Sequence, residues 1–106
     1  MNFKNIEVSE FEQLMSTPDH VVLDVRSPQE LVEGSIPDHV MINMFEPSFM
    51  QKIEKLDKSK AYLVYCRSGN RSGQTCAMMS KMGFPKLYNL NGGIGAWNQH
   101  KVKADE

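Results

Sequence analysis

Two short apolar runs constrain the fold of this chain more than any other part of its sequence. The first is Val21–Val25, which contains a single acidic residue, Asp24, and the second is Ala61–Tyr65. A strand that is buried on both faces is a continuous apolar run of this length, whereas a half-exposed strand alternates apolar and polar residues. We therefore expect both runs to form buried strands of a parallel sheet.

Helical patterns separate these runs from other predicted strands along the chain. The further predicted strands lie at residues 5–8, 40–42 and 86–90. The predicted helices begin at residue 9, span residues 28–33, 47–56 and 71–82, and begin again at residue 94. Ser9 and Glu12 have the spacing of a capping box at the start of the first helix. Strands that alternate with short helices are typical of an α/β fold in which helices cover both faces of a parallel sheet.

Length and charge limit the kind of protein. The 106 residues predict a single domain over residues 1–106, with a core from about residue 5 to 98 and a polar tail at residues 101–106. The formal net charge of −1 does not favour nucleic acid as a partner. The first residues lack the apolar region of a signal peptide, and no segment has membrane-spanning length. We therefore expect a cytoplasmic protein with no membrane partner.

The segment Cys66–Ser72 joins the second apolar run to a predicted helix and reads Cys-Arg-Ser-Gly-Asn-Arg-Ser. Backbone N–H groups converge in such a loop, and a helix N-terminus adds partial positive charge, so the segment can stabilise an anion. Gly69 permits the backbone conformations that a tight loop requires. Arg67 and Arg71 add full positive charges. These features make Cys66 the candidate nucleophile.

Ionising Cys66 near neutral pH requires several of these effects together. A cysteine with an ordinary pKa of about 8.5 is only a few per cent thiolate at that pH. Lowering the pKa by about two units takes roughly 2.7 kcal/mol, which exceeds the contribution of about 0.3–1 kcal/mol typical of a helix terminus. We expect the loop amides and arginines to contribute the remainder. The alternative is a buried, inert cysteine followed by a solvated basic turn.

Other candidate residues have structural interpretations. Cys76 lies at core-facing helical spacing with Thr75 and Met79, which favours packing over the role of a resolving thiol. Asp24 ends a strand and is followed by Arg26, so we expect this pair to support the backbone of the site. The two cysteines and three histidines have no metal-ligand spacing. We therefore expect neither a metal nor another cofactor.

Several fragments occur in the order and spacing of a known family. Residues 23–30 read Leu-Asp-Val-Arg-Ser-Pro-Gln-Glu, residues 34–37 read Gly-Ser-Ile-Pro, and Cys66–Ser72 follows. Gly-Phe at 83–84 and Leu-Asn-Gly-Gly-Ile-Gly-Ala-Trp at 90–97 complete the set. From about Ile6 to Trp97, the chain resembles the single-domain rhodaneses, which are sulfurtransferases.

The resemblance implies a rhodanese-like three-layer fold with a five-stranded, mostly parallel sheet. It implies that Cys66 takes a sulfane sulfur from a donor such as thiosulfate, or from a persulfide, and passes it to cyanide or a cellular thiol. A sulfur-relay protein is a further possible partner. The backbone N–H groups of the loop would stabilise the thiolate and the persulfide, and the two arginines would attract the anionic donor. The substrate-binding positions carried over are Arg67, Ser68, Gly69, Asn70, Arg71 and Ser72.

Departures from the family and two rival functions stay open at this point. Ser35 stands where the family commonly has His, and Asp38 and His39 replace a pair of small residues, which leaves the acceptor preference undecided. Cysteine phosphatases and arsenate reductases have a similar loop with five residues between Cys and Arg, whereas four residues separate Cys66 from Arg71. The other rival is a rhodanese-like binding module without catalysis, and such modules often lack the cysteine.

Overall fold

A five-stranded sheet organises the computed structural model, which describes residues 2–104. The strands are β1 (Lys4–Ile6), β2 (His20–Asp24), β3 (Val40–Met41), β4 (Ala61–Tyr65) and β5 (Leu87–Leu90). They lie in the order β1-β5-β4-β2-β3, and every neighbouring pair is parallel. The predicted α/β fold is confirmed, and the described sheet is parallel throughout.

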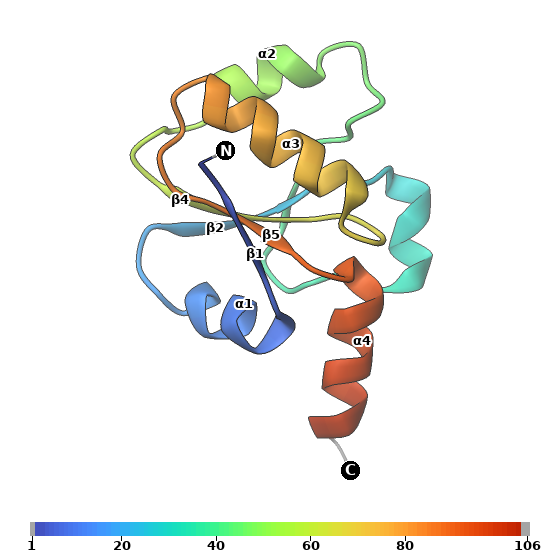
Figure 1. Cartoon of the computed structure of the whole chain (residues 1–106). Coiled ribbons are helices and arrows are strands. Elements are labelled where there is room, and N and C mark those ends of the chain that lie inside the picture. Colours follow the sequence, from blue (N-terminus) through green and yellow to red (C-terminus); the bar gives the residue numbers. More distant parts are fainter. Residues whose placement is uncertain (1, 105–106) are drawn as a thin grey trace.

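Helices cover both faces of the sheet, as Figure 1 shows. One face carries α2 (Phe49–Glu54) and α3 (Asn70–Lys81), and the other carries α1 (Val8–Met15) and α4 (Gly93–Ala104). The predicted short helix after β2 is a 3₁₀ helix, η1 (Pro28–Glu33). The fold therefore has the three layers that the sequence predicts.

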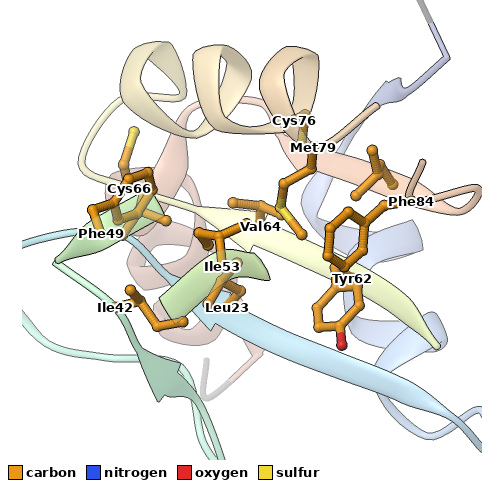
Figure 2. Close-up of a cluster of buried hydrophobic side chains, with 12 residues drawn as sticks. Leu23, Ile42, Phe49, Ile53, Tyr62, Val64, Cys66, Cys76, Met79 and Phe84 are labelled. Atoms are coloured by element: carbon orange, nitrogen blue, oxygen red, sulfur yellow. The ribbon is translucent and has the colours of Figure 1, made fainter. Parts of the chain in front are cut away.

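The central strand β4 is buried along its whole length because both of its faces are covered. Tyr62 and Val64 belong to the apolar cluster beneath α2 and α3, part of which Figure 2 shows. Leu63 and Tyr65 belong to a second cluster, beneath α1 and α4. The alternation continues one residue past the strand and places Cys66 in the first cluster.

The carboxyl ends of the central strands lie at one edge of the sheet. In the parallel register, Asp24 of β2 lies beside Tyr65 of β4, and Val64 lies beside Asn89 of β5. Cys66 directly follows β4 and therefore lies at this edge. Open parallel sheets bind ligands at the carboxyl ends of their strands.

The first helix begins earlier than its sequence pattern predicts. It starts at Val8, Glu7 is its N-cap, and no side chain caps it, so the predicted capping box of Ser9 and Glu12 is wrong. Phe11 N donates to Glu7 O at 3.0 Å, which closes the first helical turn over residues assigned to the preceding strand. The strand correspondingly ends at residue 6.

The last helix is longer than predicted, because it continues to residue 104 and includes part of the segment expected to be a polar tail. Its final turns contact α1 through a shared carboxylate. His100 Nε2 lies 2.9 Å from Glu12 Oε1, and Lys101 pairs with the other oxygen. The hydrogen bond from Lys101, followed by that from His100, lowers the pKa of Glu12. Residues 105–106 of the predicted tail lie outside the described residues.

Candidate active site

Cys66 occupies the junction between β4 and α3. The chain turns over residues 67–69, and α3 begins at Asn70 with Gly69 as its N-cap. Gly69 has a φ of 101°, and a Cβ at this position would lie 3.2 Å from Leu90 O. A residue with a side chain would be strained there, whereas glycine adopts this conformation readily. The backbone thus has the predicted strand, tight loop and helix N-terminus.

Three donors surround the Sγ atom of Cys66, a residue that is only 1% exposed. Gly69 N donates at 3.1 Å, Ser72 N at 3.4 Å and Ser72 Oγ at 3.3 Å. Burial is the largest single influence and raises the pKa of Cys66. The hydrogen bonds from the Ser72 side chain and from the amides of Ser72 and Gly69, with a smaller contribution from the nearby amide of Ser68, together outweigh burial and lower the pKa below its ordinary value. The loop therefore favours the thiolate.

The loop does not bring all of its predicted residues to the sulfur. Within the described chain, no hydrogen bond joins Sγ to the amides of Arg67, Asn70 or Arg71. Asn70 is exposed, and its amide and that of Arg71 belong to the first turn of α3. The first amides of a helix have no acceptor within it, so these two groups can serve an anion outside the helix.

Behind the loop, Ser72 contacts the buried side chain of Asn89. Ser72 Oγ lies 2.5 Å from Asn89 Oδ1 on β5. Asn89 Nδ2 donates to Gly69 O at 3.1 Å and to Asn5 Oδ1 at 2.9 Å. Ser72 is 0% exposed and Asn89 is 4% exposed, whereas Asn5, at the other end of this network, is exposed. Asn89 thereby links the loop after β4 to β5 and β1, at one side of the sheet.

Gly93, at the start of α4, presses its backbone against the loop. A Cβ at Gly93 would lie within 2.5 Å of Cys66 O and of the carbonyl carbon of Arg67. Ile94 N donates to the same Cys66 carbonyl oxygen at 3.0 Å. Only a residue without a side chain permits this approach, because real Cβ atoms do not come so close to backbone atoms. The start of α4 therefore fixes the backbone of Cys66.

Both arginines of the loop are paired with carboxylates from η1. Arg71 donates from Nη1 and Nη2 to the two oxygens of Glu30 at 2.9 and 2.6 Å, and its guanidinium lies 5.4 Å from the ring centroid of Phe45. The hydrogen bonds from Arg71, with smaller contributions from those of Ser27, lower the pKa of Glu30 to about 2. Arg67 makes a looser pair: its Nη2 lies 3.3 Å from Glu33 Oε2, and its side chain is 69% exposed. Arg71 is thus held in place, and Arg67 can move.

Asp24 and Arg26 form a fully buried ion pair beneath η1. Arg26 Nη2 lies 2.9 Å from Asp24 Oδ2, and Tyr65 Oη donates to the same oxygen at 2.7 Å. The guanidinium also donates to Glu30 O at 3.1 Å and to Gly34 O at 2.9 Å. Because these carbonyls lie in η1 and just after it, the ion pair supports the helix that pairs with the loop arginines.

An open cavity of about 600 Å³ adjoins the outer side of the loop. Its size is in the range of small-molecule sites. Glu33 and Arg67 contribute charged groups to its wall, and Cys66 itself is not part of the wall. The lining residues are Glu33, Arg67, Ser68, Gly92, Ile94, Gly95 and Asn98.

The three departures from the family lie in the turn after η1 and do not line this cavity. Ser35 and Asp38 are both exposed. His39 is half-buried, and its Nδ1 lies 2.8 Å from Ile36 O. Asp38 has a φ of 61°, which an aspartate tolerates better than most residues.

Cys76 is a core residue of α3. It is 0% exposed, and burial raises the pKa of its thiol to about 12. Figure 2 shows Cys76 near Met79, apart from Cys66 at the other end of the cluster. A neutral thiol in this position packs like a small apolar side chain.

Sequence reasoning missed three residues of the site. Asn89 is a polar residue within an otherwise apolar strand, which is a signal of a buried hydrogen-bonding role. Glu30 stands three residues after Ser27 and accepts from Ser27 N at 2.9 Å, so its spacing indicated a local cap but not its pairing with Arg71. The glycines at 92 and 93 are typical of a turn, but consecutive glycines also permit close approach of two backbones.

The chain belongs to the rhodanese-like domain family, because residues 7–100 match the sequence pattern of that family. A sulfurtransferase of Allochromatium vinosum is 36% identical over 89 residues, which cover 84% of this chain and 81% of the relative. The thiosulfate sulfurtransferase GlpE of Coxiella burnetii is 31% identical and covers 99% and 96% of the two chains. A crystal structure of a rhodanese-related protein from Thermoplasma volcanium has a TM-score of 0.79 at 30% identity, with 92% of each chain covered.

Residues 2–104 lack two other kinds of functional feature. None of the described helices has both the length and the apolar character needed to cross a membrane. The described residues also contain no group of three or more His, Cys, Asp or Glu side chains placed to bind a metal ion.

Proposed function

We propose that this protein is a sulfurtransferase that carries a sulfane sulfur as a persulfide of Cys66. Its relatives support a sulfurtransferase role in general, and the name of GlpE supports thiosulfate as a donor. The observation that carries the proposal is the position of Cys66 Sγ, which accepts hydrogen bonds from Gly69 and Ser72 and has a lowered pKa. A reactive cysteine requires such thiolate stabilisation.

The transfer consists of two displacements at sulfur. In the first, the Cys66 thiolate attacks the outer sulfur of thiosulfate, the S–S bond of thiosulfate breaks, and sulfite leaves with the bonding electron pair. In the second, a nucleophilic acceptor such as cyanide attacks the outer sulfur of the persulfide. The S–S bond to Cys66 then breaks, thiocyanate leaves and the thiolate is restored. When Cys66 is present as the thiolate, neither step requires a general base.

The loop supplies the remaining functions in this proposal. The exposed Arg67 leaves Glu33 to bind the dianionic donor, and the loss of a surface ion pair costs only about 0–1 kcal/mol. The first amides of α3, from Asn70 and Arg71, receive the negative charge of the outer sulfur. The bidentate pair with Glu30 keeps Arg71 as a fixed positive charge near the sulfur rather than as a donor ligand.

The acceptor and donor are not restricted to small molecules in this proposal. The open cavity beside Arg67 and Ser68 offers an approach for a cellular thiol or for the persulfide of a sulfur-relay protein. A compartment that keeps thiols reduced, such as the cytoplasm, suits a carrier whose nucleophile must remain a free thiolate.

Mass spectrometry after thiosulfate treatment tests the proposal directly. Wild-type protein should gain one sulfur atom, lose it on addition of cyanide, and release thiocyanate in equal amount. Cys66→Ala should gain none, whereas Cys76→Ala, which removes the buried thiol, should behave as wild type. A protein that gains no sulfur despite an accessible thiolate would be a binding module. Release of phosphate from p-nitrophenyl phosphate without sulfur transfer would instead identify a phosphatase.

A further inference from the structure

The hydroxyl of Ser72 has one proton and two acceptors. Asn89 Oδ1 lies 2.5 Å from Ser72 Oγ, and Cys66 Sγ lies 3.3 Å from the same atom. Both separations suit a hydrogen bond, since bonds to sulfur are longer than bonds to oxygen. A hydroxyl proton rotates freely about the C–O bond, so it can serve either acceptor without movement of heavier atoms. The three residues are at most 4% exposed, so the Ser72 hydroxyl is largely shielded from water.

The orientation of the Asn89 amide is set by its other contacts. Its Nδ2 lies 3.1 Å from Gly69 O, and a backbone carbonyl can only accept. The amide nitrogen must therefore face Gly69, and the amide oxygen must face Ser72. This geometry makes Asn89 a competitor of the sulfur for the hydroxyl proton.

We propose that Asn89 is a positioning residue that accepts the Ser72 proton whenever Cys66 Sγ is uncharged and yields it when Sγ is a thiolate. When Cys66 is a thiolate, Ser72 donates to Sγ rather than to Asn89 Oδ1, because hydrogen bonds to ionised groups are about twice as strong as neutral ones. Asn89 Oδ1 is then left without its donor, 2.5 Å from an oxygen lone pair. Asn89 therefore makes the thiolate less stable than the loop alone would make it.

The same competition bears on the sulfur-loaded state, a step that rests on the proposed function. In a persulfide the negative charge moves to the outer sulfur, and Sγ becomes a neutral divalent atom. The Ser72 proton then returns to Asn89, and the unfavourable O···O contact is relieved. Asn89 thus favours loaded over empty Cys66 and limits premature loss of the sulfur.

Two other titratable groups interact with the charge of Cys66: Arg71, which is kept in all the variants compared below, and Cys76, which is replaced by Ala in all of them. Arg71 favours the thiolate, although its charge is paired with Glu30, and Cys76 is a buried neutral thiol. Asn89 acts through a hydrogen bond rather than through charge. Its effect on Cys66 must therefore vanish when the Ser72 hydroxyl is removed.

A double-mutant cycle measures this dependence. The parent protein is Cys76→Ala, and the pKa of Cys66 is determined from the pH dependence of iodoacetamide alkylation in the parent, Asn89→Leu, Ser72→Ala and the double variant. Asn89→Leu should shift the pKa by about one unit further downward when Ser72 is present than in the Ser72→Ala background, since it removes the competitor of a charge-assisted hydrogen bond. The comparison cancels any effect of losing the Gly69 contact. The proposal would be overturned if Asn89→Leu shifted the pKa of Cys66 equally in the two backgrounds, or shifted it further downward in the Ser72→Ala background.

Nuclear magnetic resonance of the unaltered protein provides a second test if Asn89→Leu does not fold. The Cγ resonance of Asn89 should titrate with the same midpoint as Cys66, because its oxygen loses a donor when the thiolate forms. Asn43 is the matched control, since its Oδ1 accepts from Phe45 N and should not follow Cys66. Loading with thiosulfate should return the Asn89 resonance to its low-pH position. Failure to load would refute the proposed function alone, whereas a resonance that ignores Cys66 ionisation would refute the role of Asn89 alone.

Discussion

Replacing Glu30 by Gln should destabilise the protein and make its stability less sensitive to acid. The Glu30 side chain is 20% exposed and binds both terminal nitrogens of Arg71. Folding with this pair lowers the pKa of Glu30 from 4.5 to about 2. Because one pKa unit corresponds to about 1.36 kcal/mol, the ionised carboxylate contributes about 3 kcal/mol of folding stability at neutral pH.

The pH dependence has a definite sign. Folding depresses the pKa of Glu30, so its contribution is complete above pH 4.5 and is lost as the pH falls toward 2. Between neutral pH and about pH 3 the loss amounts to about 2 kcal/mol. The amide of Glu30→Gln does not titrate. The difference in unfolding free energy between wild type and variant should therefore narrow by the same amount over this range.

Urea unfolding followed by the fluorescence of Trp97 measures this difference at each pH. Glu33→Gln is the matched control, because Glu33 pairs with the exposed Arg67, and such surface pairs contribute about 0–1 kcal/mol. The reasoning would be refuted by a difference between wild type and Glu30→Gln that stays constant from neutral pH to about pH 3. It would also be refuted if the difference in unfolding free energy between wild type and Glu33→Gln became smaller by the same amount over this pH range.

Three further variants test other parts of the site. Arg67→Ala should raise the Michaelis constant for thiosulfate roughly tenfold and lower kcat less, in steady-state assays of thiocyanate release; an unchanged constant would show that Arg67 only faces solvent. Asp24→Asn should cost about 3–5 kcal/mol in urea unfolding, because it leaves the charge of Arg26 buried without its partner. A loss below about 1 kcal/mol would contradict that account. Gly93→Ala should abolish sulfur loading by displacing the Cys66 carbonyl, whereas Gly95→Ala, where a Cβ meets nothing within 4 Å, should load normally. Equal loading by both variants would show that the close approach is unimportant.

The sheet could be predicted from the sequence because its central strands are buried on both faces. Burial on both sides requires continuous apolar residues, and Ala61–Tyr65 is a strand over the predicted range. Helix ends were less predictable. The spacing of Ser9 and Glu12 occurs inside α1 by coincidence, and the last turns of α4 depend on contacts with Glu12 that lie 88 residues away in sequence. A local pattern contains no information on such contacts.

The same distinction applies to the site. The loop could be recognised because Cys66 and its donors, Gly69 and Ser72, are close together in the sequence. The partners that control the loop arrive through the fold: Glu30 is 41 residues from Arg71, and Asn89 is 17 residues from Ser72. The sequence therefore indicates two cationic arginines, and only the structure shows that both are paired with carboxylates.

The outermost strands of the sheet are also its shortest, with three residues in β1 and two in β3. Unpaired backbone groups along a sheet margin are templates on which another chain can add a strand and begin to aggregate. Here the five-residue strands lie inside, and the margins offer little length for such growth. A high protein concentration is therefore compatible with this architecture.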